Sequence, residues 1–135
     1  MNNDQMMKNI LLSTKTIASF GLSSNPMKES FGIVAYLKEQ GYRIIPINPT
    51  AVEILGEKAY PNLESVPEKI DVVQVFRRPE DVPPVVDSAI KIGAKIVWMQ
   101  EGIVNEEAAS TARAAGLQVV MDACMRATHM RLIGF

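Results

Sequence analysis

The residues best suited to chemistry lie in short polar stretches that directly follow apolar segments. Gly21 and Ser23 come after the first such segment, and Ser24, Asn25 and Lys28 follow in the same loop, ahead of a helical pattern. A loop that opens a helix directs backbone N–H groups and the positive end of the helix at one point, which favours an anion. In nucleotide-binding α/β folds that anion is usually a phosphate. This loop therefore indicates a site for a phosphorylated ligand.

Cations follow a later apolar segment. Arg77 and Arg78 come directly after Phe76, and the two guanidinium groups can each grip a phosphate with paired hydrogen bonds. A pair of solvated charges beside Glu80 and Asp81 is the open alternative. Together with Lys28, the pair favours a ligand that carries several phosphates.

Several common ligand classes lack their usual signals. The Gly21 loop is neither a full G-x-G-x-x-G pattern nor a P-loop, because no G-K-[ST] follows. The segment YRIIPINP at residues 42–49, which we expect to form the second strand, ends in Asn48-Pro49, where a dinucleotide enzyme normally carries the Asp or Glu that holds a ribose hydroxyl. The sequence thus gives no support for NAD, FAD or ATP hydrolysis. No His, Cys or carboxylate cluster has metal-ligand spacing, so we expect no metal site.

Cys124 and His129 are candidates for a thiol nucleophile with its base. The competing interpretation is a small buried hydrophobe and a histidine that satisfies a local hydrogen bond. No orienting third group is evident, so we expect no catalytic residues. A mixed disulfide between Cys124 and a ligand thiol is a further hypothesis from its position after a strand.

The elements that must hold these residues alternate along the chain. Three helical patterns end in glycine and lead at once into an apolar strand, at Gly41, Gly93 and Gly116. Two more strands are expected over Thr16–Leu22 and Val72–Phe76. Short strands that are apolar on both faces are typical of a parallel sheet covered by helices. We predict a doubly wound, mainly parallel five-stranded α/β sheet, with the polar stretches gathered at its carboxyl edge.

The remaining segments are interpreted from their apolar spacing and from the proline, glycine and capping residues that begin or end them. The first residues predict a short amphipathic helix with Met6, Ile10 and Leu11 turned inward. Pro79 opens a helix that runs to Ile92, Asn105 caps the next helix, and the tail after Asp122 predicts a final helix. Gly56, Pro61 and Pro67 make residues 50–68 a loop with short turns.

Length and composition limit the number of domains, the class of partner and the cellular compartment. The 135 residues fit one domain over 1–135, and the net charge of −1 does not suggest a broad nucleic-acid surface. A single cysteine suits a reducing compartment, and no apolar run approaches the roughly 20 residues of a membrane span. We expect a cytoplasmic protein with no nucleic-acid or membrane partner, and a homodimer is an open option.

The assembled segments resemble the small CoA-binding protein family, whose fold is similar to the CoA-binding domain of the succinyl-CoA synthetase alpha subunit. The resemblance runs from about Thr16 to Leu132. The matching segments are GLS at 21–23, GYRIIPINP at 41–49, ILGEKAYPNL at 54–63, VFRRPEDVP at 75–83, AKIVWMQEGIVNEEA at 94–108 and VVMDACMRATH at 119–129. Ser19-Phe20 departs from the family, which carries a small aliphatic pair there.

The resemblance implies a Rossmann-like domain that binds coenzyme A or an acyl-CoA. The pyrophosphate would lie over the Gly21 loop, the adenine and 3′-phosphate near the ends of the second and third strands, and the pantetheine arm near Gln100. The implied cofactor-binding residues are Gly21, Ser23, Ser24, Asn25, Lys28, Asn48, Pro49, Phe76, Arg77, Gln100 and Glu101. The synthetase's phosphorylated histidine belongs to a second domain and does not correspond to His129.

Two functional hypotheses lead. The first is a non-catalytic CoA carrier, sensor or regulator, and we expect binding rather than enzyme activity. The alternative is the CoA-binding component of a multi-chain acyl-CoA ligase or another CoA-dependent enzyme, with Glu101 or Asp122 as a general acid or base. An interaction protein with a vestigial pocket is the third possibility.

Overall fold

A five-stranded parallel sheet forms the centre of the computed structural model, which describes residues 2–134. The strands lie in the order β2-β1-β5-β6-β7. Their bounds are Thr16–Phe20 for β1, Arg43–Ile47 for β2, Val72–Val75 for β5, Ile96–Met99 for β6 and Gln118–Val120 for β7. This arrangement confirms the predicted α/β sheet. β1 and β5 are shorter than expected, ending before Leu22 and Phe76.

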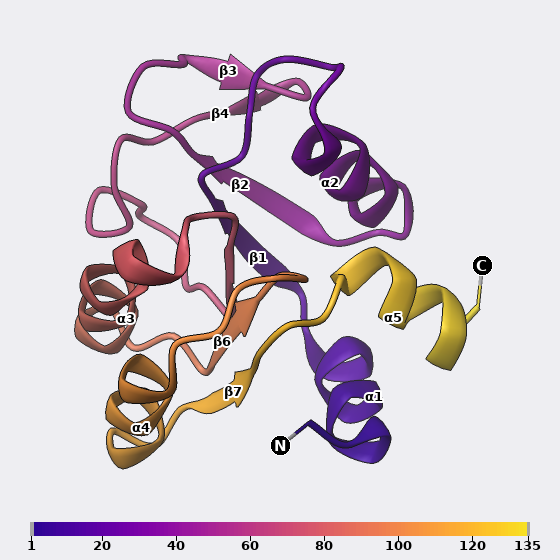
Figure 1. Cartoon of the computed structure of the whole chain (residues 1–135). Helices are drawn as coiled ribbons and strands as arrows, with labels where there is room; N and C mark the ends of the chain where they lie inside the picture. Colours follow the sequence, from indigo (N-terminus) through magenta and orange to yellow (C-terminus); the bar gives the residue numbers. More distant parts are fainter. Residues whose placement is uncertain (1, 135) are drawn as a thin grey trace.

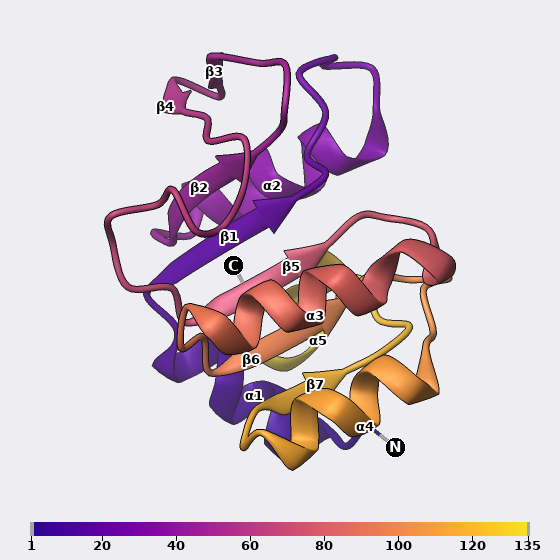
Figure 2. The ribbon, with the colours of Figure 1, turned by 90° about the vertical axis from the view of Figure 1, so that its left-hand side faces the viewer.

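Helices cover both faces of the sheet (Figure 1, Figure 2). One face carries α1 (Asp4–Ser13), α2 (Glu29–Glu39) and α5 (Met125–Leu132), and the other carries α3 (Val82–Lys91) and α4 (Glu106–Ala114). Each face has its own apolar cluster, because the buried strands present Val and Ile side chains on both sides. No helix within residues 2–134 is long and apolar enough to cross a membrane.

The predicted helix boundaries are largely confirmed. Gly41, Gly93 and Gly116 follow α2, α3 and α4 with φ of 100°, 76° and 92°, the left-handed conformation that ends a helix. Asn105 caps α4 by accepting a hydrogen bond of 2.9 Å from the Ala108 N–H. A short 3-10 turn over Pro79–Asp81 precedes α3. In α1, Ile10 and Leu11 are buried and Met6 packs half-buried against the same cluster, as expected, while Met7 is a buried residue that was not predicted.

The segment between β2 and β5 has no helix, as predicted, but it contains a hairpin that was not predicted. Its strands are β3 (Glu53–Ile54) and β4 (Glu57–Lys58). Glu57 of the hairpin pairs with Lys38 of α2 and with Arg43 of β2. Burial opposes ionisation of Glu57, but the hydrogen bonds from both cations outweigh it and lower its pKa. These ion pairs hold the segment beside β2.

Asp71 joins the starts of three strands. Its carboxylate accepts the backbone N–H groups of Lys15 and Thr16, at 2.9 and 3.0 Å, and lies 3.5 Å from Lys95 Nζ. Burial raises the pKa of Asp71, but the two N–H groups and Lys95 more than compensate, so the pKa lies below its ordinary value of 3.8. The ionised carboxylate therefore stabilises the folded chain.

Replacing Asp71 tests this contribution. We expect Asp71→Ala to lower the free energy of unfolding at pH 7 by about 2 kcal/mol, because two N–H groups lose their acceptor. A lowered folded pKa means that the contribution is present above pH 3.8 and is lost as the pH falls through the folded value. Urea unfolding of both proteins at pH 7 and pH 3 measures it, and a gap as large at pH 3 as at pH 7 would contradict the electrostatic part.

His129 packs between α5 and α2. Its Nδ1 lies 2.8 Å from the Tyr36 hydroxyl, and its ring meets the edges of the Tyr36 and Tyr42 rings. The histidine is buried, and burial lowers its pKa from 6.5. The folded chain therefore holds a neutral imidazole at pH values where the unfolded chain binds a proton.

This linkage predicts a pH effect that depends on His129. Wild-type stability should fall as the pH drops below about 6.5, because the unfolded state takes up the proton first. His129→Gln can still hydrogen-bond Tyr36 but cannot titrate. We expect thermal unfolding at pH 7 and pH 5 to show a smaller difference for the variant than for the wild type; equal differences would mean that other groups carry the whole pH dependence.

Candidate binding site

The direction in which strands are added to the sheet reverses between β1 and β5. The loop after β1 passes close to the end of β5 at this point, and we call this place the Gly21 crossing. Gly21 has φ of 87°, and a Cβ added to it would lie 3.0 Å from Arg77 Cδ and 3.2 Å from the Phe76 carbonyl oxygen. A side chain at Gly21 would therefore be strained and crowded. In open parallel sheets, ligands bind at this kind of reversal, outside the carboxyl ends of the strands. The absence of a side chain keeps the crossing open.

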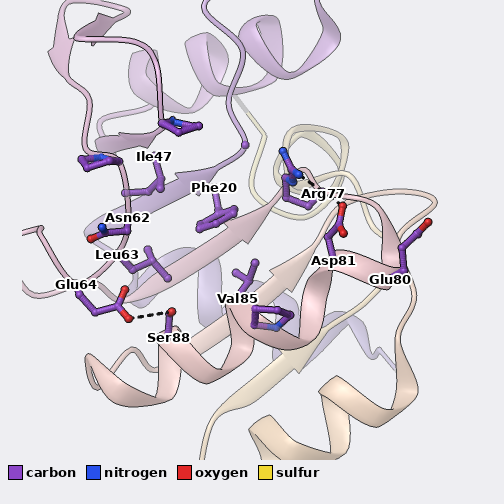
Figure 3. Close-up of a pocket in the computed structure, with 14 residues that line it drawn as sticks. Phe20, Ile47, Asn62, Leu63, Glu64, Arg77, Glu80, Asp81, Val85 and Ser88 are labelled. Carbon is purple, nitrogen blue, oxygen red and sulfur yellow. Dashed lines mark hydrogen bonds and ion pairs between the residues drawn. The ribbon is translucent and has the colours of Figure 1, made fainter.

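The larger pocket, here the apolar pocket, lies on the α3 face of this crossing and has a volume of about 420 Å³ (Figure 3). Its inner wall consists of Phe20, Ile47, Leu63 and Val85, which point toward one another across the cavity. Pro49, Pro61 and Pro84 extend the apolar surface. These walls suit a flat, weakly polar ring.

The rim of the apolar pocket is charged. Arg77 stands there with its guanidinium 3.5 Å from the Asp81 carboxylate, and its side chain is about half exposed. The Ser88 hydroxyl donates a hydrogen bond of 3.1 Å to Glu64 on the opposite side. Glu80 adds a further carboxylate. Arg77 is the cation among the described lining residues, so an anionic group bound at this rim would meet it.

A second cavity, here the amide pocket, lies on the α2 and α5 face and has a volume of about 180 Å³. The residues that line it come from the start of α2, the ends of β5 and β6, and the start of α5: Glu29, Ser30, Ile33, Phe76, Gln100, Glu101, Ile103 and Cys124. Phe76 and Arg77 are consecutive, yet each lines a different pocket. The two cavities thus flank the Gly21 crossing from opposite faces of the sheet.

The loop of residues 21–28 spans the distance between β1 and α2. It is held by one side chain of α2 and two of its own: Ser30 Oγ accepts the Ser23 N–H, Ser23 Oγ accepts the Asn25 N–H, and Asn25 Oδ1 accepts the Met27 N–H. The N–H groups of Ser24, Glu29 and Ser30 have no hydrogen-bond partner within residues 2–134. Glu29 and Ser30 are the first two residues of α2, so their N–H groups lie at its positive end, where an anion is favoured.

The residues predicted from the sequence fall into four groups. Gly21, Pro49 and Arg77 line the apolar pocket, and Phe76, Gln100 and Glu101 line the amide pocket. Ser23, Ser24, Asn25 and Lys28 belong to the connecting loop. Asn48 stands apart because its side chain is occupied within the chain. It donates to the Leu22 carbonyl and accepts the N–H groups of Thr50 and Ala51.

Sequence reasoning missed part of the pocket walls. Leu63 and Glu64 come from the irregular segment before β5, and Val85 and Ser88 come from the second turn of α3 and beyond. Neither stretch directly follows a strand, so the position of strand ends in the sequence gives no signal for it. Gln74 was missed for another reason, since it lies within a strand and looks like an interruption of an apolar run.

Cys124 and His129 do not form a pair in the fold. Cys124 is half-buried in the wall of the amide pocket, while His129 is one turn further along α5 and is engaged with Tyr36. No group of three His, Cys, Asp or Glu residues within residues 2–134 is arranged to hold a metal ion.

Comparison with known proteins identifies the family of this chain. The CoA binding domain family matches residues 15–130. The chain is 41% identical over 122 residues to the Bacillus subtilis (strain 168) protein YneT, described as uncharacterized, covering 90% of both chains. A hypothetical protein from Pyrococcus horikoshii OT3 has a structure with a TM-score of 0.95 at 41% identity, covering 98% of this chain and 94% of that one.

A larger relative matches over a shorter stretch. The ADP-forming acetate–CoA ligase II of Archaeoglobus fulgidus is 34% identical over 83 residues, which is 60% of this chain but 12% of the ligase. Since the family match spans residues 15–130, most of the chain, this protein belongs to the CoA binding domain family.

Proposed function

We propose that this protein binds coenzyme A or an acyl-CoA across the Gly21 crossing. The observation that carries the proposal is the pair of cavities on opposite faces of the sheet, joined over a residue without a side chain. A ligand that fills both must be long, must have different groups at its two ends and must bend sharply in the middle. Coenzyme A meets these requirements, with a nucleotide at one end and a thiol arm at the other.

The chemistry of each part supports one orientation. The apolar pocket suits the adenine ring, with Arg77 at its rim for the 3′-phosphate. The unpaired N–H groups at the start of α2 suit the pyrophosphate. The amide pocket then receives the end of the pantetheine arm. Under this orientation Asn48 acts indirectly, by fixing the loop after β2 to the loop after β1.

For the biological role, we propose a carrier, sensor or regulator of CoA rather than an enzyme. The alternative, a component of a multi-chain ligase, is favoured by the Archaeoglobus relative, of which the aligned stretch covers only 12%. A ligase reaction would then require other polypeptides. Co-purification with a partner, or CoA-dependent turnover only after adding cell extract, would favour the ligase component. A homodimer and a cytoplasmic location stay predictions.

Isothermal titration calorimetry tests the ligand. We expect saturable, stoichiometric heat with CoA, and no comparable binding of NAD or ATP. Dephospho-CoA should bind about tenfold more weakly, because it lacks the group that pairs with Arg77. Arg77→Ala should remove this difference, whereas Arg113→Ala on α4 should preserve it. Flat traces at millimolar CoA would refute the proposed function.

A pair of glycine variants tests the crossing. Gly21→Ala and Gly41→Ala both put a side chain at a left-handed residue, which costs about 1–2 kcal/mol of stability in each. Only at Gly21 does the added Cβ meet other atoms, since nothing lies within 4 Å of the Gly41 position. We therefore expect CoA affinity to fall at least tenfold in Gly21→Ala and to stay at the wild-type value in Gly41→Ala. Equal affinities in the two folded variants would contradict a ligand path over Gly21.

A further inference from the structure

Three buried polar side chains form a relay across the middle of the sheet. Ser19 Oγ on β1 donates to Gln74 Oε1 on β5 at 2.8 Å, and Gln74 Nε2 donates to Gln100 Oε1 at 3.1 Å. Ser19 and Gln74 are fully buried, and Gln100 is 4% exposed. Polar groups at such depth are unfavourable unless they are hydrogen-bonded. The relay satisfies each inner group in turn and ends at the wall of the amide pocket.

The relay fixes which atom of Gln100 reaches the pocket. The backbone N–H of Met125, which can only donate, bonds to Gln100 Oε1 at 3.0 Å. The side-chain oxygen therefore faces Met125 and Gln74, and the nitrogen must point the other way. Nε2 has no partner within residues 2–134, yet no fully buried side-chain polar atom of that range lacks one. Nε2 is therefore accessible, and the cavity that Gln100 lines is the amide pocket.

The other walls limit what this donor can meet. The amide pocket's volume of about 180 Å³ is less than half the 420 Å³ of the apolar pocket, which limits it to a small group. Ile33, Phe76 and Ile103 make it partly apolar, and the carboxylates of Glu29 and Glu101 lie at its edge. No Lys, Arg or His is among the described lining residues. Beyond the N–H groups of Glu29 and Ser30, which the proposed function assigns to the pyrophosphate, the pocket thus suits a small, neutral group that carries a hydrogen-bond acceptor, and its two carboxylates disfavour a second anion.

Resting on the proposed function, we propose that the amide pocket binds the short, neutral acyl group of an acyl-CoA, with Gln100 Nε2 donating to the thioester carbonyl oxygen. Free CoA ends in a thiol, which is only a weak acceptor and leaves this donor unpaired. A donor that ligand binding seals from water without supplying an acceptor is unfavourable, so the pocket distinguishes acyl-CoA from CoA. The two carboxylates discriminate against acyl groups that end in a carboxylate.

The test compares acetyl-CoA, CoA and succinyl-CoA on the reduced wild-type protein. We expect calorimetry to show acetyl-CoA binding about fivefold more tightly than CoA, in line with one net hydrogen bond, and more tightly than succinyl-CoA. Infrared difference spectra with a 13C-labelled thioester carbonyl should show a lower stretching frequency in the bound state. Equal affinities or an unshifted carbonyl would overturn this inference while leaving CoA binding intact. A lack of binding by all three would instead refute the proposed function.

Gln100→Glu probes the donor itself. The carboxylate keeps oxygens that accept from Gln74 and Met125 but removes the N–H group, so the ratio of acetyl-CoA to CoA affinity should fall to one or below. Gln118→Glu makes the same change at an exposed position at the start of β7, and it should retain the wild-type ratio. A folded Gln100→Glu protein that keeps the preference would overturn the proposal. Should this variant fail to fold, the carbonyl frequency on the wild type still decides.

Discussion

The pairing of β1 with β2 on one side and β5 on the other is the constraint on which the site depends. From β1 the chain passes through α2 on one face, and from β5 it passes through α3 on the opposite face (Figure 2). The segments that leave the ends of β1 and β5 therefore diverge to opposite faces, and neither helix covers the space between these two segments. A pocket on each face follows from this topology, and Gly21 lies between them, packed against Phe76 and Arg77.

The sequence was sufficient to predict the sheet and the edge at which polar residues gather. Apolar strands of four or five residues and helix-ending glycines are local signals, and they do not depend on distant contacts. It was not sufficient to divide the edge into two pockets. Phe76 and Arg77 are adjacent in the chain, and their separation to opposite faces depends on how β5 ends beside the Gly21 loop. That information lies in tertiary packing.

The features that were missed are long-range for the same reason. The β3–β4 hairpin is held by ion pairs to Lys38 and Arg43, which lie outside the segment. The Ser19–Gln74 hydrogen bond joins residues 55 positions apart. A serine beside a bulky Phe20 looked only like a departure from the family pattern, and the structure gives the serine a partner and makes the phenylalanine a pocket wall. Local propensity carries no signal for such pairings.

The relay is best understood through what it fixes before a ligand arrives. Three apolar side chains in these positions would stabilise the core about as well, because each internal hydrogen bond contributes only about 1 kcal/mol net. What Ser19, Gln74 and Gln100 supply is a donor whose direction is set by the Met125 N–H and by two neighbouring strands. A side chain held in this way loses little rotamer freedom on binding, which leaves more of the contact energy for affinity. The Gly21 loop contributes in the complementary way, by leaving space.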